Sequence, residues 1–352
     1  MDGKLRKTVV GASVAAVGLI SAVTLIGWKE IFGALISSSP RYMALGFVVS
    51  LGTWLAWSIS WITVVHHVGH SFSFAKHLMV FFGGLFANNI TPMGRMGGEP
   101  FIAWVLCKNS DVSYEKSLAA VFSADLINTL PFFSISVIGL LMFVILYPTT
   151  FLVKFLGTLL AVVGIAITAA LVTAWIRKDF AEEMAVFISS IVKEALSRLG
   201  LLTKKLEERL NKEMIQEKVD SFYYTVHSVV STRKRLFKAV IMSHLAWFLE
   251  IVVLYIFLIA AGWVEPRFTY ILLILPISNI ASYFPSPGGI GGFEAVLVLL
   301  LVFIAGIPVS TASVAVILYR TAAYILPTIV GGFCVFELST GASGIKKIFE
   351  EE

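Results

Sequence analysis

Six charged side chains lie inside stretches of the sequence that are otherwise apolar, and these groups are the ones most able to do chemistry there. A charge without a partner at the centre of a bilayer costs about 2.5–3.5 kcal/mol, so such groups are expected to face an interior cavity and to pair. A guanidinium binds phosphate through two parallel hydrogen bonds, whereas a carboxylate holds an arginine or carries a proton. The six residues are Arg95, Glu99, Asp125, Glu250, Glu294 and Arg320.

Two roles are open for these charges. In the first, Arg95 and Arg320 bind a phosphate, and the carboxylates position the arginines or carry a coupling proton. In the second, all six form ion pairs that hold the helices together. Asp125 and Arg320 occupy nearly equivalent positions on two similar segments, and their opposite charges invite an ion pair, although the sequence leaves open whether the two residues pair.

Three of the six charges belong to a motif that occurs twice, in residues 88–100 and 279–294. Each copy has an Asn-Ile step, a proline, a Gly-Gly pair and then a glutamate. Proline and glycine interrupt helices, and inside a bilayer the freed backbone groups must be surrounded by protein or water. Two interrupted helices in corresponding halves of a chain point to the central site of a transporter. The expected hinge positions are Pro92, Gly97 and Gly98 in the first copy and Pro287, Gly291 and Gly292 in the second.

Asparagines accompany both copies of the motif. We expect Asn88, Asn89 and Asn279 to cap the interrupted helices, because asparagine readily bonds to nearby backbone, and contact with a headgroup is the alternative. The candidate substrate-binding residues are therefore Arg95, Glu99, Glu294, Arg320, Asn89 and Asn279, with Asp125 and Glu250 as coupling or ion-pair residues.

The composition indicates a membrane protein. Apolar residues make up 58% of the 352 residues and charged residues 14%, whereas a soluble domain is nearer one half and one quarter. The net charge of +5 lies in loops, so no nucleic-acid partner is expected. Two cysteines give no disulfide framework, and the cluster of His66, His67 and His70 has no cysteine or acidic ligand nearby, so neither a metal nor a cofactor is expected.

The elements that must position the charges are apolar segments. A spanning helix needs about 20 apolar residues. Two shorter pairs of segments, 78–90 with 100–106 and 270–283 with 292–305, surround the two motifs and predict re-entrant hairpins. Pro131 and Pro327 are expected to kink the third and sixth spans. The fold class is an all-α polytopic membrane protein, with the two hairpins and about six spans at 9–28, 42–65, 117–147, 153–175, 236–262 and 310–335.

Lysine and arginine are distributed unequally among the loops. Cytoplasmic loops carry the excess of these residues, which predicts a multi-pass protein of the cell membrane with both termini in the cytoplasm. The loop 177–235 is predicted to be a cytoplasmic insert of amphipathic helices. It either lies on the membrane surface or docks a partner.

The two halves of the chain resemble each other. Leu55-Ala56-Trp57 matches residues 245–247 and Asn89-Ile90 matches residues 279–280, both at an offset of 190. Leu130-Pro131 matches residues 326–327 at an offset of 196. The single domain 1–352 therefore divides into repeats 8–147 and 153–340, each with three crossings, so the second is inverted. Inverted repeats give two related conformations, one open to each side.

At these motifs the sequence resembles the transmembrane-region family of lysylphosphatidylglycerol synthetase/flippases, which also includes the membrane half of some archaeal glycosyltransferases. The likeness is carried by residues 88–100, residues 287–294 and Leu318-Tyr319-Arg320. It implies that a lipid with an anionic or aminoacylated headgroup is moved between leaflets. The full synthetase has a soluble catalytic domain after its membrane part, and few residues follow the last span here, so aminoacyl transfer is not expected.

Three functions are open. The first is a flippase or scramblase for phospholipids or polyisoprenyl-phosphate lipids. The second is a non-transporting membrane subunit that presents lipid to a separate glycosyltransferase or synthetase, and the third is a proton-coupled transporter of a small anion. An enzyme is not expected, because the sequence has no nucleophile–base set, Walker loop or metal motif. The expected partners are membrane lipids and, for the second function, a membrane-associated glycosyltransferase or synthetase.

Overall fold

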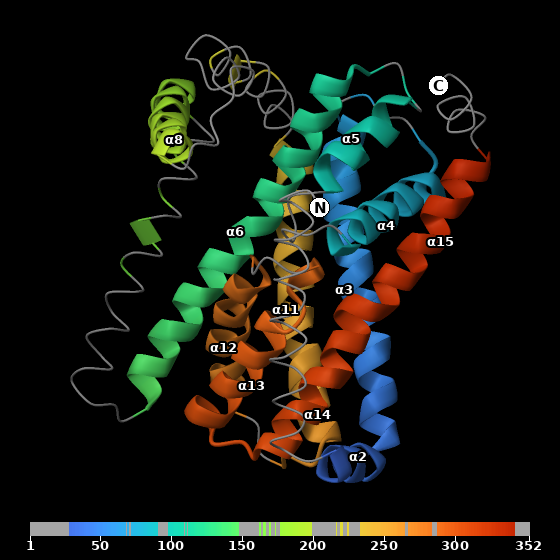
Figure 1. Cartoon of the computed structure of the whole chain (residues 1–352), viewed down its shortest axis with the longest axis vertical. Coiled ribbons are helices and arrows are strands. Elements are labelled where there is room, and N and C mark those ends of the chain that lie inside the picture. The colour runs from blue at the N-terminus through green and yellow to red at the C-terminus, as the bar shows by residue number, and fades with distance from the viewer. Residues whose placement is uncertain are drawn as a thin grey trace.

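The computed structural model describes residues 28–67, 72–90, 98–108, 112–147, 177–198, 233–264, 267–283 and 287–341, with isolated positions between them. The regular elements in these ranges are helices, and the longer ones stand side by side along the long axis (Figure 1). They are α2 (Trp28–Ile36), α3 (Pro40–His67), α4 (Phe74–Ile90), α5 (Gly98–Lys108), α6 (Tyr114–Leu146), α8 (Lys178–Arg198), α11 (Arg233–Ala260), α12 (Phe268–Ile280), η2 (Ala281–Tyr283), η3 (Pro287–Gly289), α13 (Gly292–Ala305), α14 (Val309–Arg320), η4 (Thr321–Ile325) and α15 (Leu326–Gly341).

Four described segments are long and apolar enough to cross a membrane. They are Pro40–His66, Lys116–Leu146, Arg233–Ala260 and Val309–Leu338, the last of which joins α14, η4 and α15. These segments coincide with four of the six predicted spans. The other two, 9–28 and 153–175, lie outside the described residues except for single positions. The chain is an all-α polytopic membrane protein, as predicted.

The two short helix pairs enter the bundle from opposite ends. In Figure 1, α3 rises to the upper end, α4 and α5 form a hairpin that enters from that end, and α6 descends. In the second half α11 descends, α12 and α13 form a hairpin that enters from the lower end, and α14 and α15 rise. The second half therefore runs through the same elements in the opposite direction, which an inverted repeat requires.

The contact between α3 and α11 joins corresponding residues of the two predicted repeats. Trp57 and Trp247 occupy the same position in the two Leu-Ala-Trp triplets, and their ring centroids lie 6.0 Å apart. Residues that touch their own repeat counterpart lie beside the axis that relates the two copies. Two other contacts between the halves also correspond to each other. α4 packs against α15, and α12, the counterpart of α4, packs against α6, the counterpart of α15.

Glycines allow these helix pairs to approach closely. A β-carbon on Gly331 of α15 would lie 2.2 Å from the carbonyl oxygen of Phe82 in α4. A β-carbon on Gly139 of α6 would lie 2.7 Å from the carbonyl oxygen of Leu272 in α12. Phe82 and Leu272 are separated by the repeat offset of 190. Small residues at helix contacts allow the close packing on which association in a membrane depends.

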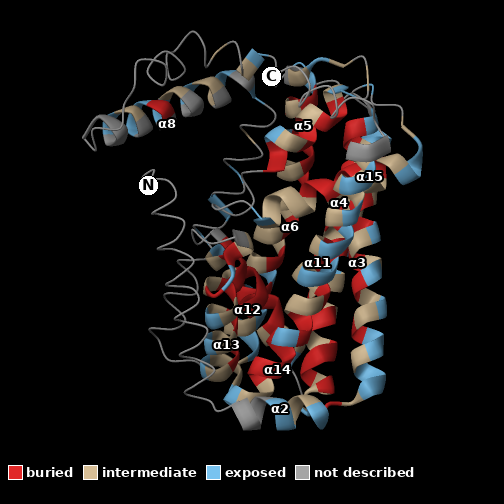
Figure 2. Ribbon diagram, turned by 45° about the vertical axis from the view of Figure 1, so that its right-hand side comes forward, coloured by how far each residue is buried: buried red, intermediate tan, exposed pale blue. Residues whose placement is uncertain are grey.

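Each half packs around its own hairpin. The first core joins α3, α4, α5 and α6 and includes Trp61, Phe81 and Leu106. The second core joins α11, α12, α13 and α14 and includes Leu275 and Tyr319. Figure 2 shows buried residues in both regions, around α5 and around α12 and α14. Each half therefore has its own buried cluster, and each cluster also includes a residue of the other half, Ala239 of α11 in the first and Ile135 of α6 in the second.

The two prolines of the long spans have different effects. Pro131 lies inside α6, which is α-helical from Tyr114 to Leu146. Proline has no N–H to give to the carbonyl four residues earlier, and Ser243 Oγ of α11 donates to that carbonyl of Ile127 at 3.2 Å. Pro327 follows the π-helical segment η4, and π segments are often found at functional sites. The helix is interrupted only at the second proline, so the two predicted kinks are not equivalent.

Two peripheral helices complete the fold. α2 lies across the lower end of the bundle and packs against α14, and the sequence pattern did not indicate this helix. α8 lies beside the upper end in the first part of the predicted insert. Its apolar side chains Phe187 and Ile191 are exposed. The second predicted helix of the insert lies outside the described residues.

The basic residues of the described chain gather at one end. α8 and the segments that carry Lys76, Lys108, Lys116 and residues 233–235 are at the upper end in Figure 1. Arg41 is at the lower end, where α3 begins. This distribution agrees with the loop asymmetry of the sequence. The orientation of the termini stays a prediction.

Candidate functional site

The second Pro/Gly turn depends on glycines. Gly288, Gly289 and Gly291 have φ angles of 57°, 69° and 87°, in the left-handed region that favours glycine. A β-carbon on Gly289 would lie 2.6 Å from the backbone of Ser282. The turn therefore folds tightly onto η2, which follows α12, and it places the start of α13 inside the bundle.

Glu294 both caps α13 and binds Arg320. Its Oε2 atom accepts the backbone N–H of Gly291 at 2.7 Å, and its Oε1 atom accepts the Nε–H of Arg320 at 2.5 Å. A carboxylate in the first turn is also stabilised by the partial positive charge of the helix N-terminus. Both carboxylate oxygens are therefore engaged, and the side chains of the pair are only 18% and 12% exposed.

Arg320 fastens the turn to α14. Its Nη2 atom donates to the carbonyl oxygen of Gly288 at 3.1 Å. The guanidinium carbon lies 4.2 Å from the ring centroid of Tyr324 and 5.0 Å from that of Phe293, within the range of cation–π attraction. Arg320 pairs inside its own half, with Glu294 rather than with Asp125, because α13 packs directly against α14.

Tyr324 connects the tips of the two hairpins. Its hydroxyl donates to the backbone carbonyl of Asn89 at the end of α4, at 3.1 Å. Asn89 Nδ2 in turn donates to Thr328 Oγ1 at 2.7 Å, and α4 packs against η3. The hairpin tips therefore meet, as expected. Sequence reasoning missed Tyr324, although a tyrosine one helical turn after Arg320 was a signal for it.

The first turn is described only at its two ends. Asn88 Oδ1 accepts the backbone N–H of Gly98 at 2.5 Å, so Asn88 caps α5 as expected. Asn279 is buried and donates to the carbonyl of Leu275 in its own helix, which is not a cap. Glu99 lies in the first turn of α5 and is buried. Arg95, Pro92 and Gly97 lie outside the described residues.

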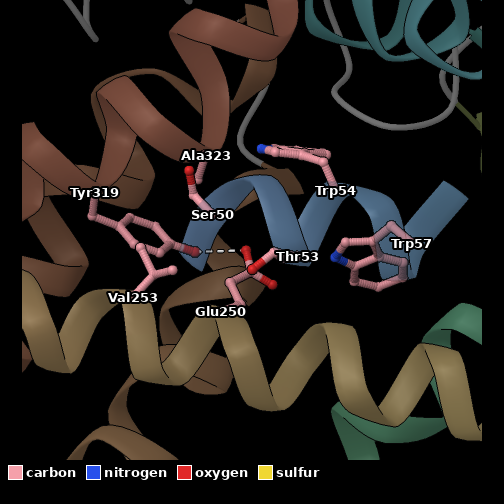
Figure 3. Close-up of a pocket in the computed structure, with 8 residues that line it drawn as sticks. All are labelled: Ser50, Thr53, Trp54, Trp57, Glu250, Val253, Tyr319 and Ala323. Atoms are coloured by element: carbon pink, nitrogen blue, oxygen red, sulfur yellow. Dashed lines mark hydrogen bonds between the residues drawn. The ribbon is translucent and has the colours of Figure 1, made fainter. Parts of the chain in front are cut away.

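A small recess, with room for about one water molecule, lies where α3, α11, α14 and η4 meet. In Figure 3 the carboxylate of Glu250, the hydroxyl of Tyr319 and the indoles of two tryptophans surround a common space. The recess thus combines one carboxylate with hydroxyl groups and aromatic rings. Its lining is Ser50, Thr53, Trp54 and Trp57 of α3, Glu250 and Val253 of α11, Tyr319 of α14 and Ala323 of η4.

The recess adjoins the ion pair. Tyr319 donates its hydroxyl to Glu250 Oε1 at 2.6 Å. The ring of Tyr319 stacks on that of Phe293, with centroids 5.9 Å apart and planes 20° apart, and Phe293 lies beneath the Arg320 guanidinium. A chain of contacts therefore runs from the Glu250 carboxylate to the Glu294–Arg320 pair.

The structure brings only some of the predicted residues together. Glu294 and Arg320 pair, and Glu250 lies in the recess, but Glu99, Glu294 and Arg320 do not line it. The other lining residues were missed, although Ser50, Thr53, Trp54 and Trp57 recur at helical spacing on one face of a predicted span. In the described part of the chain, no three His, Cys, Asp or Glu side chains are grouped to hold a metal.

The fold and this site define a polytopic helical membrane protein with two opposed hairpins and a polar recess between its halves. Residues 8–331 match the family described as "Lysylphosphatidylglycerol synthase TM region". The match covers most of the chain, so the protein belongs to this family.

Similar relatives carry the name UPF0104 membrane protein. One from Methanothermobacter thermautotrophicus is 27% identical over 332 residues, which cover 93% of this chain and 92% of the relative. A relative from Pyrococcus horikoshii is 24% identical over 91% of this chain and 95% of its own. One from Methanocaldococcus jannaschii is 23% identical over 94% and 95%. The similarity therefore extends over nearly the full length of each protein.

Proposed function

We propose that the protein moves a lipid headgroup between the two leaflets, as a flippase or scramblase. The observation that carries this proposal is the recess with Glu250, which lies between spanning helices of both halves. An ionisable residue inside a spanning segment is expensive, and such residues usually mark the path of a substrate or an ion. Two opposed hairpins around a central site are also typical of secondary transporters.

The chemistry of the recess favours a headgroup that carries an ammonium group. Glu250 supplies a negative charge, and Trp54 and Trp57 supply aromatic faces, which attract such cations. Tyr319 positions the carboxylate through its hydrogen bond. Among anionic phospholipids, aminoacylated phospholipids and polyisoprenyl phosphates, the aminoacylated class suits this lining best. The family is named for a synthase of lysylphosphatidylglycerol, a lipid of that class.

The phosphate of the same lipid requires a cation. Arg320 is engaged by Glu294 and Gly288, so it binds a phosphate only if that ion pair opens. Arg95, from the first turn, is the other candidate. A bidentate phosphate contact by either arginine would complement the ammonium site.

Exchange of labelled lipids between leaflets tests the proposal. The purified protein is placed in liposomes with a panel of fluorescent lipids: aminoacylated, anionic and neutral phospholipids and a polyisoprenyl phosphate. We expect the protein to accelerate the exchange of the aminoacylated lipid over protein-free liposomes. Lipid binding without exchange would support a subunit that presents lipid to an enzyme instead, and proton-driven uptake of inorganic phosphate would support an anion transporter.

A further inference from the structure

Because the halves repeat, several donors and acceptors beside the recess have counterparts in the other half. Donors on α3 correspond to donors on α11 at an offset of 190, and acceptors before Pro327 correspond to acceptors before Pro131. The counterpart of the recess is a seam between α11 and α6. The corresponding pairs are Thr53 with Ser243, Trp57 with Trp247, Ala323 with Ile127, and Tyr324 with Asn128.

The seam is closed by hydrogen bonds between its helices. Ser243 Oγ donates to the carbonyl oxygen of Ile127 at 3.2 Å. Trp247 Nε1 donates to the carbonyl oxygen of Asn128 at 3.0 Å, and Ser60 Oγ of α3 donates to Asn128 Oδ1 at 2.9 Å. Ser243 is fully buried. These bonds join α3, α6 and α11 into one packed unit.

The corresponding bonds are not made at the recess. Thr53 Oγ1 donates to Val49 of its own helix at 3.3 Å rather than to Ala323. The Trp57 indole N–H has no hydrogen-bond partner among the described residues, and in Figure 3 its nitrogen faces the recess. α3 is instead joined to η4 by a hydrogen bond from Trp54, whose Nε1 atom donates to the carbonyl oxygen of Ala322 at 3.3 Å. The two halves thus differ in the contacts that would make them symmetric.

In both halves the acceptor is a backbone carbonyl that lies four residues before a proline. Ile127 and Ala323 each lie four residues before a proline, at Pro131 and Pro327. Proline has no N–H to donate to that carbonyl, so a side chain from a neighbouring helix is able to bond to it. In the seam Ser243 makes this bond, whereas in the recess Ala323 lies in the lining.

We propose that the molecule alternates between this arrangement and one related to it by the repeat. In the second arrangement Thr53 and Trp57 donate to the carbonyls of Ala323 and Tyr324 and close the recess. Ser243 and Trp247 release Ile127 and Asn128, and the seam opens. Both arrangements use the same kinds of bond, so their free energies are close enough for both to be populated. The inference rests on the proposed function for its purpose, because alternate opening gives the headgroup access to each leaflet.

The test uses two reporter positions that are repeat counterparts. Val253 of α11 lines the recess, and its counterpart at the offset of 190 is Thr63 of α3, which would line the opened seam if the repeat holds. Each is changed to cysteine in a background in which the two free cysteines, Cys107 and Cys334, are replaced by alanine. The full chain is held in lipid nanodiscs, which expose both faces to a water-soluble methanethiosulfonate, and the rate of labelling is measured.

Matched alanine variants should shift the two reporters in opposite directions. Ser243→Ala removes a bond of the arrangement described here, so labelling at Thr63→Cys should rise on the order of fivefold and labelling at Val253→Cys should fall, as expected for one lost hydrogen bond. Thr53→Ala removes a bond between helices only in the second arrangement, because its present bond to Val49 lies within α3, so labelling at Thr63→Cys should fall. Shifts in the same direction, or no shift in protein that remains monodisperse, would overturn the proposal.

Disulfide locks supply a second measurement. A Ser243→Cys, Ile127→Cys pair should cross-link readily, protect Thr63→Cys and leave Val253→Cys reactive. A Thr53→Cys, Ala323→Cys pair should do the reverse. If both pairs cross-link in one molecule, or neither lock changes either reporter, the proposal is wrong. Cysteine labelling reports the alternation between the two arrangements and needs no lipid transport. Absence of alternation and absence of lipid translocation are therefore detected by separate assays.

Discussion

Glu250 and Glu294 are both glutamates in apolar helices, and their surroundings give them different roles. Glu294 is engaged at both oxygens, by Arg320 and by the start of α13, so it holds the second turn in place. Glu250 faces a recess with two indoles and accepts a hydrogen bond from Tyr319. Charge alone did not distinguish the two residues, but their neighbours do.

The ion pair should be structural, which a double substitution tests. Arg320→Ala leaves the Glu294 carboxylate without its cation inside the bundle and should destabilise the protein by about 3–5 kcal/mol. The double variant Arg320→Met with Glu294→Gln removes both charges and should recover most of that loss. Thermal unfolding in detergent measures both.

A single variant as stable as the wild-type protein would contradict this structural role. A double variant no more stable than the single one would show that the turn depends on hydrogen bonds to Arg320 rather than on charge balance. Leaflet exchange by a stable double variant would also show that Arg320 is not needed to bind phosphate.

Inference about single residues succeeded for one of the capping asparagines. Asn88 accepts the N–H of Gly98, ten residues further along the chain, and so caps α5 as predicted, whereas Asn279 bonds to its own helix. The partner of Arg320 was left open by the sequence, because choosing between Asp125 and Glu294 requires knowing which helices pack together. Tyr324 and Trp57 were missed for the same reason, since their roles arise from contacts between distant segments.

At the scale of helices, small residues and prolines determine the contacts. Gly139 and Gly331 allow each long span to pack on the hairpin of the other half. Pro131 frees a carbonyl for Ser243, and Pro327 follows a π-helical segment. The spans and hairpins were predictable from apolar length and from the Pro/Gly motifs. Neither α2 nor the π segment was, because a short amphipathic helix and a local widening leave little trace in hydropathy.

Gly331 should tolerate a methyl group far less well than its neighbour. Gly331→Ala places a β-carbon 2.2 Å from the carbonyl oxygen of Phe82, which is backbone and cannot move aside. The expected loss of stability is about 1–3 kcal/mol, as for other overpacked positions. Gly332→Ala is the matched control, since its β-carbon would lie 3.3 Å from the flexible Phe86 ring. Equal melting temperatures for the two variants would show that α15 and α4 do not pack as described.

At the scale of the whole molecule, the two halves match in their helices but differ in their hydrogen bonds. Their corresponding helices run in opposite directions, and Trp57 and Trp247 meet between them. Yet hydrogen bonds between helices close the seam on one side of this contact, and their counterparts are not made at the recess on the other. A symmetric scaffold held in an asymmetric arrangement is suited to alternate access.

The orientation in the membrane follows from the distribution of basic residues. We expect both termini and the 177–235 insert to be cytoplasmic. A cysteine introduced by Lys205→Cys should therefore resist an impermeant thiol reagent added to intact cells and should react after the cells are opened. Arg267→Cys, at the opposite end, serves as the positive control. Labelling of Lys205→Cys in intact cells would reverse the assigned sidedness.

Leaflet exchange by a Glu250→Gln variant tests the central claim most directly. Glutamine keeps the shape and the hydrogen bond from Tyr319 but removes the charge, so exchange of the aminoacylated lipid in liposomes should slow by about tenfold or more, as expected when a charged contact is lost. Glu337→Gln, at an exposed position on α15, is the control and should exchange lipid at the wild-type rate. Wild-type exchange by a folded Glu250→Gln protein would contradict the account, because the recess would then not carry the headgroup.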